Sequence, residues 1–298
     1  MSKKHKENAN IRSNITFNSI SGGKTSAYIL ANYNADYNIF ALVRTSDRKC
    51  QFPDKKLRQY VSDKIGTEFI GTLEDDIIIY TIIDLEQYTG KKIDWVTGEH
   101  FDDIITGTKN QLLPSALRRF CTASLKITPI FEFWRKNVGI ENPITTNIGI
   151  RADEMERAKR IQDKTNENGY LINKYIVGKR GSRNKWNHVP WQKPNFPLIK
   201  DNIYKDNIEK YWQGKNVRFA WMNNCVGCFH KQPVLINKMS KLHPNKLEWF
   251  ASKERNRKHE FDKWRVDGIT YDEMINYNYQ MELFEDDFNS CDSGHCGL

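Results

Sequence analysis

The sequence contains no apolar stretch that approaches the roughly 20 residues needed for a membrane-spanning helix. The charged opening segment, residues 1–6, is not followed by the apolar region of a secretory signal peptide. The composition also excludes a largely disordered chain, because 39% of the residues are hydrophobic and 12% are aromatic. We therefore expect a globular protein of the cytoplasm with no membrane partner.

Cysteine is scarce, with 6 residues in a chain of 298. Four of them form two close pairs, Cys225 with Cys228 and Cys291 with Cys296, whereas Cys50 and Cys121 stand alone. In the cytoplasm, paired thiols more often bind metal or carry redox chemistry than build a disulfide framework. The isolated Cys50 is expected to be a small, buried apolar side chain.

Acidic residues are fewer than basic ones, 37 against 46, which gives a net charge of +9. The basic residues gather at residues 179–185 and 253–258. Such clusters favour polyanionic partners, including nucleotides, tRNA and DNA. A solvated loop and helix face would explain them equally well.

Apolar strand patterns alternate with helical patterns along the chain. We expect strands at residues 15–19, 39–43, 92–96 and 144–150, and helices at residues 24–33, 54–64, 75–88 and 122–136. This alternation predicts an α/β protein with a parallel sheet covered on both faces. We place the main domain at residues 11–211 and a smaller cysteine-bearing subdomain at residues 212–298.

Two segments carry weaker patterns. Residues 166–197 are polar and contain three prolines, which predicts an irregular insertion with one strand at residues 175–177 and a candidate substrate loop. The tail beyond Tyr271 is acidic and ends in glycine- and cysteine-containing sequence. We expect that tail to be mobile or ordered by a ligand.

The strongest local signal is a glycine turn between the first strand and the first helix. Its phosphate-binding candidates are Ser19, Ser21, Gly22, Gly23, Lys24, Thr25 and Ser26. The glycines allow close backbone approach, the helix N-terminus offers N–H groups to an anion, and the other side chains add hydroxyls and charge. The turn is not a Walker A loop, because the first glycine of that motif is missing.

The turn resembles the SGGxxS loop of the PP-loop ATP pyrophosphatase, or adenine nucleotide alpha-hydrolase, superfamily. Three further segments are similar to motifs of that group, and they follow in the same order. Residues 119–127 resemble R-x-C-T-x-x-L-K, residues 148–157 resemble G-x-R-x-D-E-x-x-R, and residues 196–198 leading to Tyr211 and Trp212 resemble a P-L segment before a helix that ends in an aromatic pair. The order resembles that of bacterial and phage proteins of the phosphoadenosine-phosphosulfate reductase-like family.

The resemblance implies a doubly wound, mostly parallel sheet that binds ATP or adenylyl sulfate, with Mg²⁺, at the carboxyl ends of its strands. It implies electrostatic roles for Lys24, Lys126 and Arg151 and a nucleotide contact for Arg157. Structural ion pairs are the competing explanation for each of these cations. Where many relatives carry Asn-Thr-Gly-x-Glu, this chain has residues 44–47, so Asp47 is only a candidate substitute.

The cysteines permit three arrangements. Cys121, Cys225, Cys228 and either Cys291 or Cys296 would hold a [4Fe–4S] cluster, as the resemblance to iron–sulfur members implies. In the second arrangement four thiolates hold structural Zn²⁺, which uses the same C-x-x-C spacing, and His230 is an alternative to one of the sulfurs. In the third arrangement, Cys296 is a nucleophile, because the final three residues resemble the C-G-L of the reductase's catalytic tail.

These patterns lead to three functional hypotheses. The first is ATP-dependent adenylation with pyrophosphate release, for sulfur metabolism or sulfur modification of a nucleic acid, with a cysteine desulfurase as a candidate partner. The second is a phosphosulfate reductase that uses Cys296 and thioredoxin. The third is a non-catalytic protein that binds nucleotide or nucleic acid.

Overall fold

The computed structural model describes residues 15–107 and 111–277. Its strands are β1 (Thr16–Ile20), β2 (Tyr37–Arg44), β3 (Asp94–His100), β4 (Ile144–Asn147), β5 (Leu171–Arg180) and β6 (Arg183–Asn195). The helices before β4 are α1 (Lys24–Asn32), α2 (Lys55–Ile65), α3 (Ile77–Thr89), α4 (Phe101–Thr106), α5 (Phe120–Thr122) and α6 (Thr128–Asn137). The later helices are α7 (Met155–Gln162), α8 (Pro197–Lys200), α9 (Lys205–Trp212), α10 (Pro233–Leu242), α11 (Pro244–Arg255) and α12 (Tyr271–Asn276).

Short helical turns complete the secondary structure. They are the 3₁₀ turns η1 (Arg48–Cys50) and η3 (Ala152–Glu154) and the π-helical turn η2 (Ala123–Ile127). The helix expected at residues 122–136 is therefore divided, because η2 widens the backbone between α5 and α6. π-helical turns are rare and occur often at functional sites.

One six-stranded sheet forms the centre, in the order β3-β2-β1-β4-β6-β5. All neighbouring pairs are parallel except β5 and β6, which are antiparallel. The chain passes outward from β1 to β3 and then returns to the other side of β1 at β4. The expected mostly parallel α/β sheet is thus confirmed, and it is compatible with a Rossmann-like fold.

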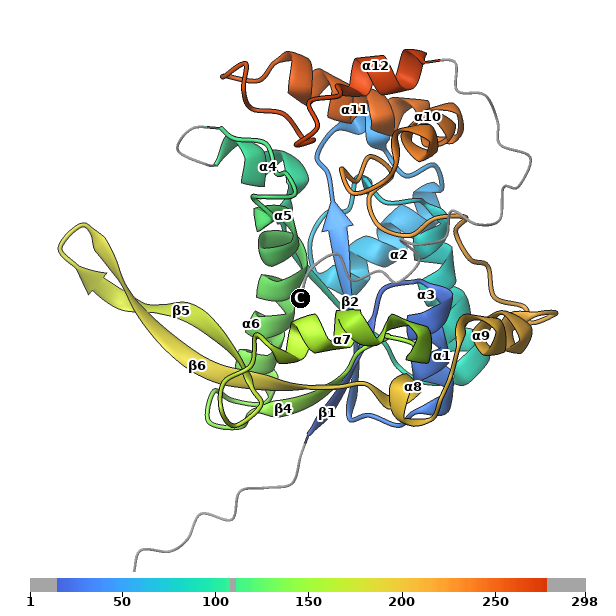
Figure 1. Cartoon of the computed structure of the whole chain (residues 1–298), viewed down its shortest axis with the longest axis vertical. Coiled ribbons are helices and arrows are strands. Elements are labelled where there is room, and N and C mark those ends of the chain that lie inside the picture. The colour runs from blue at the N-terminus through green and yellow to red at the C-terminus, as the bar shows by residue number, and fades with distance from the viewer. Residues whose placement is uncertain (1–14, 108–110, 278–298) are drawn as a thin grey trace, which may run out of the picture.

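Helices cover both faces of this sheet (Figure 1). On one face, Ile20 and Phe40 pack with apolar side chains of α1, α2, α3 and α9. On the other face, Phe17 and Ile39 pack with α6, including the fully buried Trp134. Successive strand residues point to opposite faces, so the alternation within β1 and β2 supplies both cores.

Four asparagines form a ladder across the middle of the sheet. Asn18 of β1 donates to Asn38 of β2 over 2.9 Å, and Asn147 of β4 donates to Asn18 over 2.8 Å. Asn195 of β6 donates in turn to Asn147 over 2.6 Å. Because a buried amide must find a partner, this ladder fixes the register of the four strands against one another.

The prediction of an irregular insertion at residues 166–197 was wrong, although the one strand expected within it, residues 175–177, lies inside β5 and is confirmed. The segment forms a long antiparallel hairpin of β5 and β6, with a turn at Gly181 in the left-handed region (φ 62°). Alternating exposure along residues 171–176 is the strand signal, but a register shift between Ile176 and Gly178 interrupts it. Pro190 and Pro194 lie within β6, where the pattern of prolines had indicated a loop.

The C-terminal helices share a core with the first part of the chain. Side chains of α10, α11 and α12 pack against Val43 of β2, Leu73 and Leu125. Figure 1 shows these helices beyond the carboxyl end of β2. The cysteine-bearing segment thereby covers the edge of the sheet at which parallel strands end.

Candidate functional site

The glycine turn joins the end of β1 to the start of α1. Gly22 has a φ of 80°, and a Cβ atom there would lie 2.7 Å from Cγ2 of Ile78 on α3. Only glycine fits this conformation and this approach without strain. The Ser21 backbone N–H donates to Oγ of Ser26 over 3.1 Å, which holds the turn over the start of the helix.

A cavity of about 110 Å³ lies beside this turn, at the carboxyl ends of β1 and β2. Its lining joins residues that are far apart in the sequence: Ser19, Ser21, Cys121, Lys126, Cys225 and Cys228. Aromatic side chains, including Phe101, Trp191, Phe229 and Phe250, form much of the remaining wall. Hydroxyls, one cation and three thiols therefore converge on a largely apolar space, which is the usual composition of a small-molecule site.

A buried carboxylate holds the cation of this cavity in place. Nζ of Lys126 lies 2.8 Å from Oε1 of Glu74, whose side chain is only 3% exposed. The backbone of Glu74 also forms a bridge with Cys225, and the neighbouring Val226 donates to the Leu73 carbonyl over 2.8 Å. Glu74 thus connects the lysine to the cysteine turn. Sequence reasoning missed it, because no motif distinguishes Glu74 from the two acids that follow it, Asp75 and Asp76, before the helix.

The C-x-x-C segment forms a tight turn that packs against Phe250 and is held by Lys231. Cys228 N–H donates to the Cys225 carbonyl over 3.0 Å, and the buried Lys231 amino group donates to that same carbonyl over 2.7 Å. A Cβ at Gly227 would lie 2.3 Å from the Phe250 ring, so the turn requires glycine. Burial raises the pKa of Cys225 well above its usual value, with a smaller contribution from the charge of Glu74. Burial also raises the pKa of Cys121 to about 11, with a smaller contribution from the neighbouring Cys228 thiol.

The donor set has the right chemistry for a thiolate-bound metal. Three thiols line one cavity, together with His230, whose Nε2 is buried and has no hydrogen-bond partner among the described residues. Burial and then the charges of Arg119 and Arg265 lower the pKa of His230, which favours the neutral imidazole that binds metal. In the described part of the chain, however, no group of three or more such side chains is arranged to hold an ion. Cys291 and Cys296 lie outside the described residues.

The other predicted cations do not belong to the cavity lining of the described residues, and they define what is here called the outer side of the turn. Lys24 forms an ion pair with Glu209 of α9, and the Trp212 indole donates to the Lys24 carbonyl over 3.0 Å. Arg151 pairs with Asp153 at 3.1 Å, and Arg157 pairs with Glu154 at 3.0 Å. These three cations are not among the described residues that line the cavity.

The segment after β4 nevertheless packs against the start of α1. A Cβ at Gly149 would lie 3.4 Å from the backbone nitrogen of Ser26 and from Cγ2 of Thr25. Arg151 follows two residues later, and its side chain is 9% exposed. The sequence motif that contains Arg151 is therefore next to the glycine turn, although its guanidinium already has a carboxylate partner.

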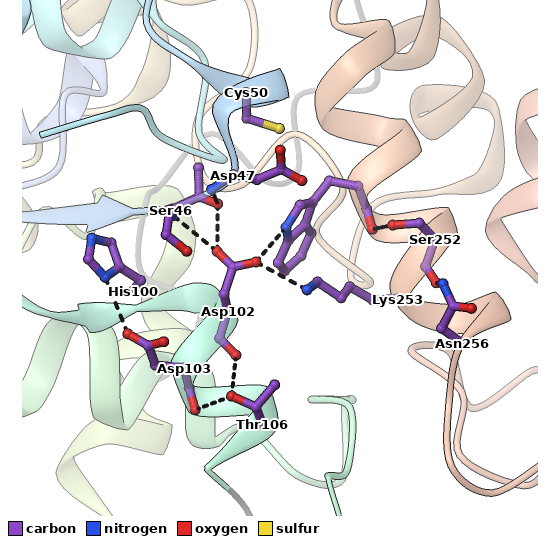
Figure 2. Close-up of polar contacts among 12 residues, drawn as sticks. Ser46, Asp47, Cys50, His100, Asp102, Asp103, Thr106, Ser252, Lys253 and Asn256 are labelled. Atoms are coloured by element: carbon purple, nitrogen blue, oxygen red, sulfur yellow. Dashed lines mark hydrogen bonds and ion pairs between the residues drawn. The ribbon is translucent and has the colours of Figure 1, made fainter.

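Asp47 has a structural contact in the loop after β2. Its carboxylate accepts from the Lys49 backbone N–H over 2.8 Å and so caps η1. The nearby Asp102 forms more hydrogen bonds than Asp47 does (Figure 2). Its carboxylate accepts from Thr45 Oγ1 over 2.7 Å and from the Trp249 indole N–H over 2.9 Å. Burial raises the pKa of Asp102, but these bonds and Lys253 outweigh it and hold that pKa below its usual value. Asp102 thereby fastens α11 to the loop after β2.

Cys50 is buried and lies apart from this cavity lining, and burial raises its pKa to about 12. The expectation that Cys50 is a buried apolar side chain is confirmed.

None of the described helices is both long and apolar enough to cross a bilayer.

Comparisons with protein-family models, with curated proteins and with solved structures each found no match to this chain.

Proposed function

We propose that the protein is a PP-loop enzyme that binds an adenine nucleotide at the glycine turn and activates a substrate by adenylation. The observation that carries the proposal is the cavity that joins Ser19 and Ser21 to Lys126 and to three thiols. In this proposal the sheet is doubly wound, and the nucleotide lies at the reversal of strand order between β1 and its neighbours β2 and β4.

The residues of the chain act by positioning and by charge. The N-terminus of α1 presents N–H groups without intrahelical partners to the phosphates, and the hydroxyls of Ser21 and Ser26 lie beside them. Lys126 is held by Glu74 at a fixed place in the cavity wall, where it offsets negative charge that develops on the phosphates. The aromatic wall provides an apolar surface for the flat base.

The proposed step transfers the adenylyl group. A substrate oxygen attacks the α-phosphorus of ATP, the bond from that phosphorus to the bridging oxygen breaks, and pyrophosphate leaves. The substrate's proton passes to solvent. The adenylated carbon or phosphorus centre is then open to attack by sulfur.

We propose that Cys121, Cys225 and Cys228 bind a [4Fe–4S] cluster or Zn²⁺, with the fourth ligand supplied by His230 or by a tail cysteine. When bound, a cluster would supply sulfur or electrons beside the activated substrate, and zinc would hold the turn together. Anaerobic purification with an absorption spectrum and iron, sulfide and zinc analysis distinguishes these metals. Cys225→Ser is expected to remove the metal, whereas Cys50→Ser, a matched buried thiol, is expected to retain it.

Calorimetry with Mg²⁺ and ATP, followed by an assay for pyrophosphate, tests the main proposal. Lys126→Met is expected to abolish pyrophosphate release, while Lys55→Met, an exposed lysine on α2, is expected to leave it intact. Absence of adenine nucleotide binding at millimolar concentration would contradict the proposal. Release of sulfite from adenylyl sulfate compounds with thioredoxin, without pyrophosphate release from ATP, would instead identify the reductase chemistry that uses Cys296.

A further inference from the structure

The hairpin of β5 and β6, residues 171–195 and here called the arm, extends beyond the sheet. Only residues 192–195 of β6 pair with β4, whereas residues 183–190 pair with β5 alone. Figure 1 shows the two strands projecting from the body as a twisted ribbon. The arm therefore extends its tip and the exposed face of its strands away from the body of the molecule.

The charge of the arm has one sign. No acidic residue occurs between Glu167 and Asp201, a stretch that contains seven basic residues. These are Lys174, Lys179, Arg180, Arg183, Lys185, Lys193 and Lys200; each is exposed, and all but Lys200 belong to the arm. Four of them surround the turn at the tip. Because the arm contains no carboxylate to neutralise them, this cluster is complementary to a polyanion.

One face of the arm also carries exposed apolar side chains. The cross-strand pairs Ile172 with Pro190, Lys174 with His188 and Ile176 with Trp186 all lie on exposed positions. The Trp186 side chain is 48% exposed, and Nζ of Lys174 lies 5.2 Å from the centre of its ring. The opposite face has Tyr175 against Phe131 of α6, so it is the outer face that is left without cover.

We propose that the arm binds double-stranded DNA, with its tip in the major groove and its lysines and arginines on the phosphates. A two-stranded β-ribbon fits the B-form major groove, which is about 12 Å wide, whereas the major groove of A-form RNA is too narrow for side chains to read. A single-strand site would need a series of aromatic platforms, and the arm has one exposed indole with Lys174 over its ring.

The arm leads directly to the cavity. Trp191 and Gln192 lie at the base of the arm, and they line the same cavity as Lys126 and Cys225. A duplex that follows the arm thereby approaches the nucleotide site. DNA binding by the arm stands independently of the adenylation chemistry, while the assignment of DNA as the acceptor in that reaction rests on the proposed function.

The experiment measures fluorescence anisotropy of a labelled duplex of about 21 base pairs, or about two helical turns, across salt from about 50 to 200 mM. The arm variant replaces Lys179, Arg180, Arg183 and Lys185 with alanine and retains Gly181. The control variant replaces four exposed lysines elsewhere with alanine: Lys55, Lys56, Lys210 and Lys241. Both variants lower the formal charge from +9 to +5, that is 9 − 4, so net charge alone cannot separate them.

We expect the arm variant to bind duplex DNA at least about 100-fold more weakly than the wild type. The magnitude of its slope of log K against log salt should be smaller by about 4, because each phosphate contact contributes about 0.9 to that slope. The control variant is expected to remain within about threefold of the wild type. Equal losses in both variants, an unchanged arm variant, or a preference for tRNA or single strands over the duplex would overturn the proposal.

Thermal melting and adenine nucleotide calorimetry on the same variants keep the two proposals apart. The altered side chains are exposed and distant in sequence from the glycine turn, so folding and nucleotide affinity should not change. A protein that binds the duplex but no nucleotide would leave the arm proposal standing and refute the proposed enzyme. A protein that binds nucleotide but no duplex would do the reverse.

Discussion

The two sides of the glycine turn carry the same residue types in different surroundings. On the cavity side, Lys126 pairs with Glu74, whose side chain is 3% exposed. On the outer side, Lys24 pairs with Glu209, whose side chain is 39% exposed, and Arg151 pairs with Asp153, which is 38% exposed. Exposed pairs contribute between 0 and about 1 kcal/mol, whereas loss of one partner from a buried pair costs several. The sides therefore differ in how readily a phosphate can replace the carboxylate.

This comparison assigns distinct roles to cations that the sequence treats alike. Lys24 can exchange its carboxylate for a ligand at small cost, because both members of its pair are about one third exposed, so it is suited to a partner that binds and dissociates. The Arg151 side chain is only 9% exposed, so a ligand there would have to take the place of Asp153 directly. Lys126 cannot leave Glu74 without isolating a buried charge. We interpret Lys126 as a fixed element of the cavity wall.

The largest effect is expected for Lys126→Met. Loss of the ammonium leaves the Glu74 carboxylate buried without its cation, which should lower the free energy of unfolding by about 3 kcal/mol. Urea titration measures this change. The double variant Lys126→Met with Glu74→Gln should recover most of the stability and none of the pyrophosphate release. If the double variant is as unstable as the single one, Glu74 is not the reason for the position of Lys126.

The next effect is expected for Gly22→Ala. The methyl group would lie 2.7 Å from Ile78 Cγ2, and the φ of 80° is unfavourable for alanine. We expect a loss of about 2 to 3 kcal/mol in unfolding free energy and at least a tenfold loss of ATP affinity.

The control for Gly22→Ala is Gly66→Ala, because Gly66 has a φ of 68° and open space where a Cβ would lie. It should cost about 1 kcal/mol and leave ATP affinity unchanged. Equal losses of affinity would show that the close approach to α3 is irrelevant.

The sequence predicted the regions that local chemistry determines. The glycine turn and the alternation of strands and helices follow from glycine conformations and from apolar periods, and the burial of Cys50 follows from the apolar character of an isolated cysteine. It did not predict the pairings that depend on distant contacts. Glu74 becomes important only when β-bridge formation brings it to Cys225, and Asn18 becomes a ladder member only beside Asn38 and Asn147.

The arm was mistaken for a loop for a related reason. Prolines and polar residues dominate its sequence, but antiparallel pairing between two exposed strands needs no apolar run on either face. The cation assignments show the same limit. The glycine motif placed Lys24 near a phosphate, while the carboxylate of Glu209 that pairs with it lies 185 residues further along the chain and is brought there by folding.

A smaller effect is expected for Lys24→Met. Both members of its ion pair are about one third exposed, so the loss of stability should stay below about 1 kcal/mol. If the outer cations contact phosphate only when the nucleotide is bound, ATP affinity should fall by about tenfold while AMP affinity stays the same. Glu209→Gln removes the carboxylate instead and should leave ATP binding equal or tighter. A stability loss as large as that of Lys126→Met would erase the difference between the two sides.

The smallest effect concerns the acid response of the outer side. Burial raises the pKa of Asp153, but the hydrogen bond and charge of Arg151 outweigh it and hold that pKa below its usual value. A carboxylate with a lowered pKa in the folded state contributes stability that is present above about pH 4 and is lost as the pH falls through the folded-state pKa. Because Asp153 is 38% exposed, the contribution should stay below about 1 kcal/mol. Urea titrations from pH 7 to pH 3 should therefore show Asp153→Asn slightly less stable than the wild type at neutral pH and equal to it in acid. A gap that persists at the lowest pH would mean that Arg151 owes its position to packing rather than to this charge.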